Sequence, residues 1–120
     1  MYFEQQASGW LQQKGLKPVQ QNYHCRSGEI DLIMLDKNTL CFIEVKYRKN
    51  NAFGGTAYSI PVSKQQKITK AALTFITSQK KFQQHNYRFD ALFITPEDSL
   101  RKLSFEWIQN AFSTEQSGYY

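Results

Sequence analysis

Two segments in which polar and apolar residues alternate constrain the fold of this chain more than any other feature. They span residues 29–34 and 42–47, and alternation with a period of two is typical of a half-buried β-strand. The polar residues 36–39 between them have the composition of a hairpin turn. We therefore predict an antiparallel hairpin with one polar strand surface.

The register of this hairpin brings two carboxylates together. Loops of two residues and of four residues both place Asp31 opposite Glu44, and Glu29 opposite Lys46. Opposed side chains have Cβ atoms about 4.5–5.5 Å apart, so two carboxylates in this position repel each other unless a cation lies between them. Mg²⁺ is often held by one or two carboxylates, with water and substrate phosphate completing its shell. We predict that Asp31 and Glu44 bind Mg²⁺ or Mn²⁺.

Lys46 follows Glu44 by two residues and therefore faces the same side of its strand. From there it could contact a scissile phosphate or the attacking water. An ordinary salt bridge between Glu29 and Lys46 is the alternative explanation. The opposition of Asp31 and Glu44 favours the metal site, because a solvated strand surface would place a lysine against a carboxylate. Glu29 is predicted to support Lys46 and not to bind the metal.

Composition limits the class of protein. The chain has 120 residues, 41% of them hydrophobic, which suits one compact core. Its net charge of +5 favours a nucleic-acid partner, although many modestly basic proteins bind none. Cys25 and Cys41 lack the spacing of a zinc site and of a secreted disulfide framework. We also find no signal peptide and no apolar run of the ~20 residues that a membrane span needs, and predict a cytoplasmic protein.

Periodicity and turn residues divide the chain into elements. We predict a single domain over 1–112 and a flexible tail over 113–120. Ser63 and Gln66 have the spacing of a capping box, and Pro96 is expected to end a strand. The predicted order is a helix at 3–14, strands at 18–25, 28–35 and 40–48, a helix at 63–79, strands at 87–94 and 101–105, and a short helix at 106–112. This order describes an α/β sandwich with a mixed central sheet.

Asp31 followed by Glu44-Val45-Lys46 resembles the core motif of the PD-(D/E)xK nuclease superfamily. Longer matches, from about residue 4 to 112, resemble the YraN-type bacterial family; they include 22–33, 42–48, 53–54, 62–65 and 88–90. By pattern, the chain also resembles the archaeal-type Holliday-junction resolvases. The resemblance implies a restriction-endonuclease-like sandwich of order αβββαβ with short C-terminal elements.

The resemblance also implies further site residues. In related resolvases a glutamate of the first helix points into the metal site, and Glu4 lies at the matching Glu-x-x-Ala position. An acidic residue also stabilises a helix N-terminus, which is the alternative explanation for Glu4. Lys64 resembles the basic or amide residue beside the metal. Further candidates for contact with nucleic acid are Gln65, which lies next to Lys64, and Lys67, which fits a site residue and a solvated residue alike. Arg48 and Lys49 extend the strand beyond Lys46 and could contact a phosphate, but are equally compatible with a solvated strand end.

These features predict a Mg²⁺- or Mn²⁺-dependent endonuclease acting on DNA, including branched or structured DNA. Asp31, Glu44 and Lys46 would carry the chemistry, with Glu4 and Glu29 assisting. Symmetric cutting of a branch would require a homodimer. The alternative is a non-catalytic nucleic-acid-binding or assembly factor that keeps the nuclease fold.

Overall fold

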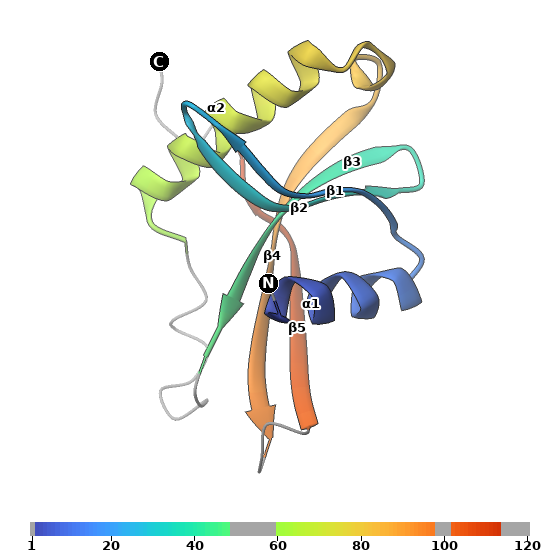
Figure 1. Cartoon of the computed structure of the whole chain (residues 1–120), viewed down its shortest axis with the longest axis vertical. Helices are drawn as coiled ribbons and strands as arrows, with labels where there is room; N and C mark the ends of the chain where they lie inside the picture. The colour runs from blue at the N-terminus through green and yellow to red at the C-terminus, as the bar shows by residue number, and fades with distance from the viewer. Residues whose placement is uncertain (1, 49–59, 98–101, 114–120) are drawn as a thin grey trace.

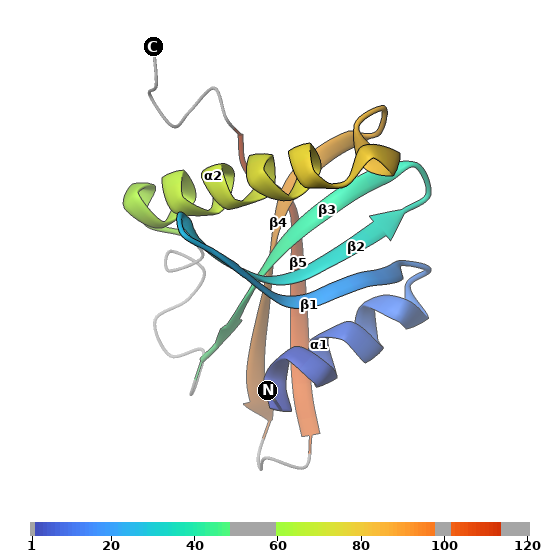
Figure 2. The ribbon, with the colours of Figure 1, turned by 45° about the horizontal axis from the view of Figure 1, so that its top comes forward.

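The computed structural model describes residues 2–48, 60–97 and 102–113. These residues form a mixed sheet in the order β1-β2-β3-β4-β5, with α1 on one face and α2 on the other (Figures 1 and 2). The elements are α1 (Tyr2–Gln13), β1 (Lys17–Cys25), β2 (Gly28–Asp36), β3 (Thr39–Tyr47), α2 (Val62–Ser78), a 3-10 turn (Lys80–Phe82), β4 (Asn86–Glu97) and β5 (Lys102–Phe112). β3 and β4 are parallel and the other neighbours antiparallel. The predicted α/β sandwich with a mixed sheet is confirmed.

Alternation along the strands gives the sheet two apolar layers. The layer beneath α2 includes Ile33, Phe42, Phe75, Phe89 and Phe93. The layer beneath α1 includes Leu11, Leu32, Ile43, Leu92 and Ile94. Side chains of even number along β3 therefore face α2 up to the end of the strand, and those of odd number face α1. This rule decides on which side of the sheet each candidate residue lies.

The β2–β3 hairpin has the predicted register, from Asp36 paired with Thr39 to Leu32 paired with Ile43. On the N-terminal side of Leu32, the β1–β2 hairpin bends away from β3 and its tip lies near α2 (Figure 1). The bend coincides with Asn22 on β1, which has a φ of 53° and lies between the pairs Gln21–Leu32 and Tyr23–Ile30. The second half of β3 therefore pairs with β4 and, among the described residues, has an open edge on its other side.

The tip of the β1–β2 hairpin reaches α2 through a close contact at Gly28. A Cβ atom on Gly28 would lie 3.2 Å from the Cβ atom of Lys67 and 3.3 Å from its carbonyl oxygen. A side chain at this position would therefore have to displace helix backbone. Glycine lets the hairpin tip and the first turns of α2 pack closely, which fixes the helix beside the open edge of β3.

Three predictions about the elements are wrong. Ser63 does not cap α2, which begins at Val62 after Pro61 without a side-chain cap. Pro96 does not end β4, which continues to Glu97. The last pair between β4 and β3 is Ile94 with Tyr47, so Pro96, which has no backbone N–H, loses no hydrogen bond to β3. Residues 106–112 are strand and not helix, because Leu103, Phe105 and Trp107 alternate against the α1 layer.

Some sequence features lie outside the described residues. They include Lys49, the motif at 53–54 and residues 114–120. In the part of the chain that the structure describes, no helix is both long enough and apolar enough to cross a membrane.

Candidate functional site

Asp31 lies where β2 leaves β3. Its carboxylate oxygen Oδ2 accepts a hydrogen bond of 2.8 Å from the backbone N–H of Val45. The Asp31 side chain thus accepts the hydrogen bond that the Val45 N–H of β3 would otherwise donate to a backbone carbonyl of a neighbouring strand. The strand pairing stops one pair short of the predicted Asp31–Glu44 opposition, but this bond holds the Asp31 carboxylate against the residue that follows Glu44.

Glu44 is buried, with 6% of its surface exposed, and faces α2. Two lysine ammonium groups approach its Oε2 atom: Lys64 Nζ from α2 at 3.4 Å and Lys46 Nζ from β3 at 3.8 Å. The lysine side chains remain 37% and 41% exposed. Both lysines therefore contact the buried carboxylate while their side chains remain partly exposed to solvent.

Burial and the negative charge of Glu44 raise the pKa of Asp31 to about 7. The hydrogen bond from Val45 lowers it in part, the charge of Glu4 raises it further, and Lys64 lowers it. Glu4 on α1 and Lys64 on α2 thus act electrostatically on Asp31 from elements that cover opposite faces of the sheet. A carboxyl whose pKa is raised by burial and by a neighbouring carboxylate is typical of sites that bind a cation or transfer a proton.

The donor set fits a hard divalent cation. Among residues 2–48, 60–97 and 102–113, no group of three or more His, Cys, Asp and Glu side chains is arranged to hold a metal, as a structural zinc site would require. Mg²⁺ is commonly held by one or two carboxylates and keeps several waters. Asp31 and Glu44 match this smaller requirement, and a cation there would relieve the repulsion from Glu44 that, after burial, raises the pKa of Asp31.

The other candidates for contact with nucleic acid lie around this site in different situations. Arg48 Cζ lies 4.7 Å from the ring centre of Phe93, and its backbone N–H donates to the carbonyl of Ile94 at 2.8 Å. Gln65 donates its side-chain amide to the carbonyl of Ile60 at 2.7 Å, which stabilises the start of α2. Lys67 is exposed above the hairpin tip. Arg48 and Lys67 thus extend the basic surface, whereas the Gln65 amide has a structural partner.

Glu29 corrects one sequence prediction. It pairs with His24 across the β1–β2 hairpin, with 3.3 Å between its Oε2 atom and His24 Nδ1, and it lies on the exposed part of that hairpin. The predicted pairing of Glu29 with Lys46 is therefore wrong. The physical reason is the bend at Asn22 and Asp31, which ends the β2–β3 register before it reaches Glu29.

A second set of charged residues faces the α1 layer. It includes Arg88 and Asp90 of the segment 88–90 noted in the sequence, but the partners of this pair on other strands were not identified there. The buried Asp90 carboxylate accepts bonds from Arg88 Nε at 3.0 and 3.1 Å, from Trp107 Nε1 at 3.0 Å and from the N–H of Asn110 at 3.0 Å. Arg88 also donates to Asp36 at 2.9 Å. The alternation of Leu103, Phe105 and Trp107 could have revealed β5 over its full length, and with it the two donors that β5 supplies to Asp90.

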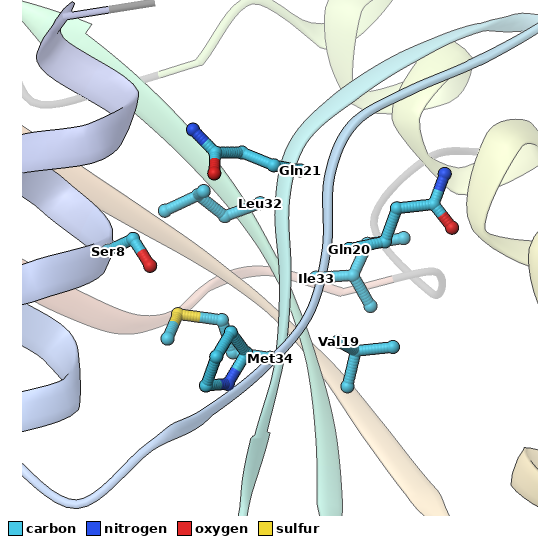
Figure 3. A pocket seen from close by; sticks show the side chains of 8 residues that line it. Ser8, Val19, Gln20, Gln21, Leu32, Ile33 and Met34 are labelled. Atoms are coloured by element: carbon cyan, nitrogen blue, oxygen red, sulfur yellow. The ribbon is translucent and has the colours of Figure 1, made fainter.

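A cavity at the edge strand β1 is separate from this chemistry. It lies between α1, β1 and β2 and has a volume of about 240 Å³ (Figure 3). It is lined by Ser8, Pro18, Val19, Gln20, Gln21, Leu32, Ile33 and Met34. Since none of these side chains titrates near neutral pH, the cavity offers no acid or base for catalysis.

Comparisons with known proteins identify the family. Residues 3–94 match the model of the "Uncharacterised protein family UPF0102". Similar proteins are UPF0102 proteins from Psychromonas ingrahamii (48% identical, covering 91% of this chain and 84% of the relative), Nitrosomonas europaea (45%, covering 91% and 88%) and Alcanivorax borkumensis (43%, covering 93% and 89%). The chain belongs to the UPF0102 family, which confirms the resemblance to the YraN-type bacterial family.

Proposed function

We propose that this chain is a Mg²⁺- or Mn²⁺-dependent endonuclease that hydrolyses phosphodiester bonds in DNA, with branched or structured DNA as its substrate. One observation carries the proposal: Asp31, with its pKa raised to about 7, lies beside buried Glu44 at the open edge of β3. Lys46 and Lys64 approach the same Glu44 oxygen. Carboxylates and lysines in this arrangement suit a phosphate that approaches a divalent cation.

Each side chain has a distinct task in this proposal. Asp31 and Glu44 would hold the cation, which supplies an activated water and neutralises phosphate charge when bound. The Val45 N–H fixes the orientation of Asp31. Lys46, ion-paired with Glu44 yet 41% exposed, would stabilise the negative charge that develops on the phosphate oxygens. Lys64 would bind the neighbouring phosphate from the α2 side.

Two further features support the proposal. The order of helices and strands through β4 agrees with the order that the nuclease resemblance implies. The net charge of +5 favours approach to a polyanion. Cutting a four-way junction symmetrically would require two copies of the chain, so we propose a homodimer on that substrate. We also propose a cytoplasmic location, in keeping with two free cysteines.

A non-catalytic nucleic-acid-binding or assembly factor is the second candidate. One contact favours it: the Lys64 ammonium group lies 3.4 Å from Glu44 Oε2 and already supplies a positive charge to the buried carboxylate. In this candidate the lysine, and not a metal, would balance the charge of Glu44, so phosphate binding by the surrounding basic side chains would not require a divalent cation. The two candidates differ in their response to divalent cations.

Cleavage assays separate the two candidates. Labelled single-stranded, linear duplex, flap and four-way DNAs are incubated with the protein in Mg²⁺, in Mn²⁺ and in EDTA. The nuclease proposal expects metal-dependent products, and a loss of about 100-fold or more in Lys46→Ala at unchanged melting temperature. Lys70→Ala, a change of an exposed lysine on α2, serves as the matched control and should retain activity. If the wild type cleaves none of these DNAs in either metal, the nuclease proposal is wrong and the binding function replaces it.

A further inference from the structure

Three aromatic rings gather where the start of α1 meets the end of β3. Phe3 stacks on Tyr47 with 4.3 Å between ring centres and 23° between ring planes. Tyr2 meets Phe3 edge-on at 5.0 Å. Tyr2 is 53% exposed and Tyr47 is 38% exposed, although a buried position would stabilise such large rings. The array therefore presents two tyrosines to solvent on a phenylalanine that packs against the α1 layer.

These rings lie next to the carboxylate site in the fold. Tyr47 follows Glu44 by three residues along β3, a separation of about 10 Å at the rise of an extended strand. Phe3 directly precedes Glu4, whose charge acts on Asp31. The aromatic array and the acidic site thus share the open half of β3.

The array and the basic groups lie on opposite sides of that edge. Glu44 and Lys46 face α2, where Lys64 also approaches. Tyr47 faces α1, where Phe3 stacks on it. A single nucleic-acid strand crossing the edge would place its phosphates toward the lysines and a base toward the tyrosines. A duplex cannot do so, because its bases are paired and stacked inside the helix.

We propose that Tyr2 and Tyr47 form a stacking surface for an unpaired base of the DNA strand whose phosphate reaches Asp31 and Glu44. The inference rests on the proposed function and gives that site a preference for single-stranded segments, such as those at flaps, ends and opened junctions. Aromatic rings beside a basic groove are the usual means of binding single strands without reading their sequence. The charges of Lys46, Arg48 and Lys64 match the phosphates of such a strand.

Binding measured in EDTA tests the stacking surface independently of catalysis. Fluorescence anisotropy compares a labelled oligothymidine with a duplex of equal length. Tyr47→Leu and Tyr2→Leu should each weaken single-strand binding by about tenfold, within the usual range for loss of one base stack, and change duplex binding by less than about twofold. Tyr47→Trp should keep single-strand affinity, and its added fluorescence should be quenched when the oligonucleotide binds.

Tyr87→Leu is the matched control. Tyr87 is 39% exposed, similar to Tyr47, but its ring packs against Phe42 and Phe89 in the α2 layer. It should leave both affinities within about twofold of the wild type. If Tyr47→Leu and Tyr2→Leu lower single-strand and duplex affinity equally, or lower neither, the stacking surface is wrong. Should Tyr47→Leu not fold, Tyr2→Leu and the quenching of Tyr47→Trp decide the question.

The two proposals fail in different assays. Loss of single-strand selectivity in the tyrosine variants with no cleavage by the wild type would overturn the nuclease proposal and support the stacking surface. Metal-dependent cleavage by the wild type, together with unchanged single-strand binding in the tyrosine variants, would support the nuclease proposal and overturn the stacking surface.

Discussion

The sheet contains two buried carboxylates whose surroundings differ sharply. Asp90, 1% exposed, accepts hydrogen bonds from Arg88, Trp107 and the backbone of Asn110. Glu44, 6% exposed, has lysines at 3.4 and 3.8 Å and the second carboxylate of Asp31 close by. The charge of Asp90 is matched by fixed donors, whereas the Glu44 site concentrates negative charge against flexible, half-exposed lysines.

The pKa shifts express the same contrast. Burial alone would lower the pKa of Arg88, but the hydrogen bonds to Asp90 and Asp36 raise it above its ordinary value. Burial and Glu44 raise the pKa of Asp31 to about 7. In the first region the charged forms stabilise one another, and in the second they oppose one another. We infer that the Asp90 region holds the fold together and that the Asp31 region is kept for binding.

Removing the Asp90 charge should have the largest effect on stability. In Asp90→Asn the mostly buried Arg88 keeps only one of its two carboxylate partners, Asp36. We expect a loss of about 3–5 kcal/mol in the free energy of unfolding. Urea unfolding at pH 7 measures it. Glu97→Gln, which removes a carboxylate from an exposed pair with Lys102 at 3.8 Å, is the control and should cost less than about 1 kcal/mol. Equal losses in the two variants would remove the distinction between a structural and an exposed carboxylate.

Asp31→Asn should stabilise the protein at neutral pH. Because the pKa of Asp31 rises from 3.8 to about 7 on folding, the folded state holds more protons than the unfolded state between these values. Stability is therefore lost as pH rises from about 4 to 7, by up to about 4 kcal/mol. The amide has no charge to bury and can still accept the Val45 bond.

Unfolding curves of the wild type and Asp31→Asn at pH 4, 6 and 8 check this prediction. The two proteins should be similar at pH 4, and the variant should be the more stable one at pH 8. A variant that is less stable than the wild type at pH 8 would mean that Asp31, like Asp90, stabilises the fold through its charge.

We expect Lys64 and Lys67 to contribute to DNA binding, in contrast to Arg88, whose charge is paired with Asp90 and Asp36. Lys64→Gln should weaken binding of DNA and reduce the magnitude of the slope of log K against log salt by about one unit, as expected for the loss of one phosphate contact. Lys67→Gln should act in the same direction, and Lys70→Gln less. Anisotropy titrations between 50 and 200 mM salt measure these slopes. If Lys70→Gln has an effect equal to that of Lys64→Gln, the basic surface does not centre on Glu44.

The smallest effect is expected at Glu29. Its partner is His24, with both side chains more than half exposed, so Glu29→Gln should cost less than about 1 kcal/mol. It should also leave any metal-dependent cleavage within about twofold of the wild type. A loss comparable to that of Lys46→Ala would restore a role for Glu29 in positioning Lys46.

Local sequence pattern predicted much of the Asp31–Glu44 site and few of the contacts around Asp90. Asp31, Glu44 and Lys46 could be placed together because hairpin register follows from alternation and turn length, and Glu4 and Lys64 came from the family resemblance. The Glu29–Lys46 pairing failed because a bend at Asn22 is a tertiary feature. Two donors to Asp90, the Trp107 indole and the Asn110 N–H, come from β5. They depended on recognising 106–112 as a strand, where short apolar spacing fits helix and strand alike.

Metal binding tests the central claim most directly: that Asp31 and Glu44 together hold a divalent cation. Calorimetric titration of Mn²⁺ into the wild type and Asp31→Asn at pH 6 and pH 8 measures it, with Glu29→Gln as the control. We expect one site in the wild type that is tighter at pH 8, because protons compete for Asp31 below its pKa of about 7. The site should be lost in Asp31→Asn and retained in Glu29→Gln. Equal Mn²⁺ binding by the wild type and Asp31→Asn, or none by either, would contradict the account.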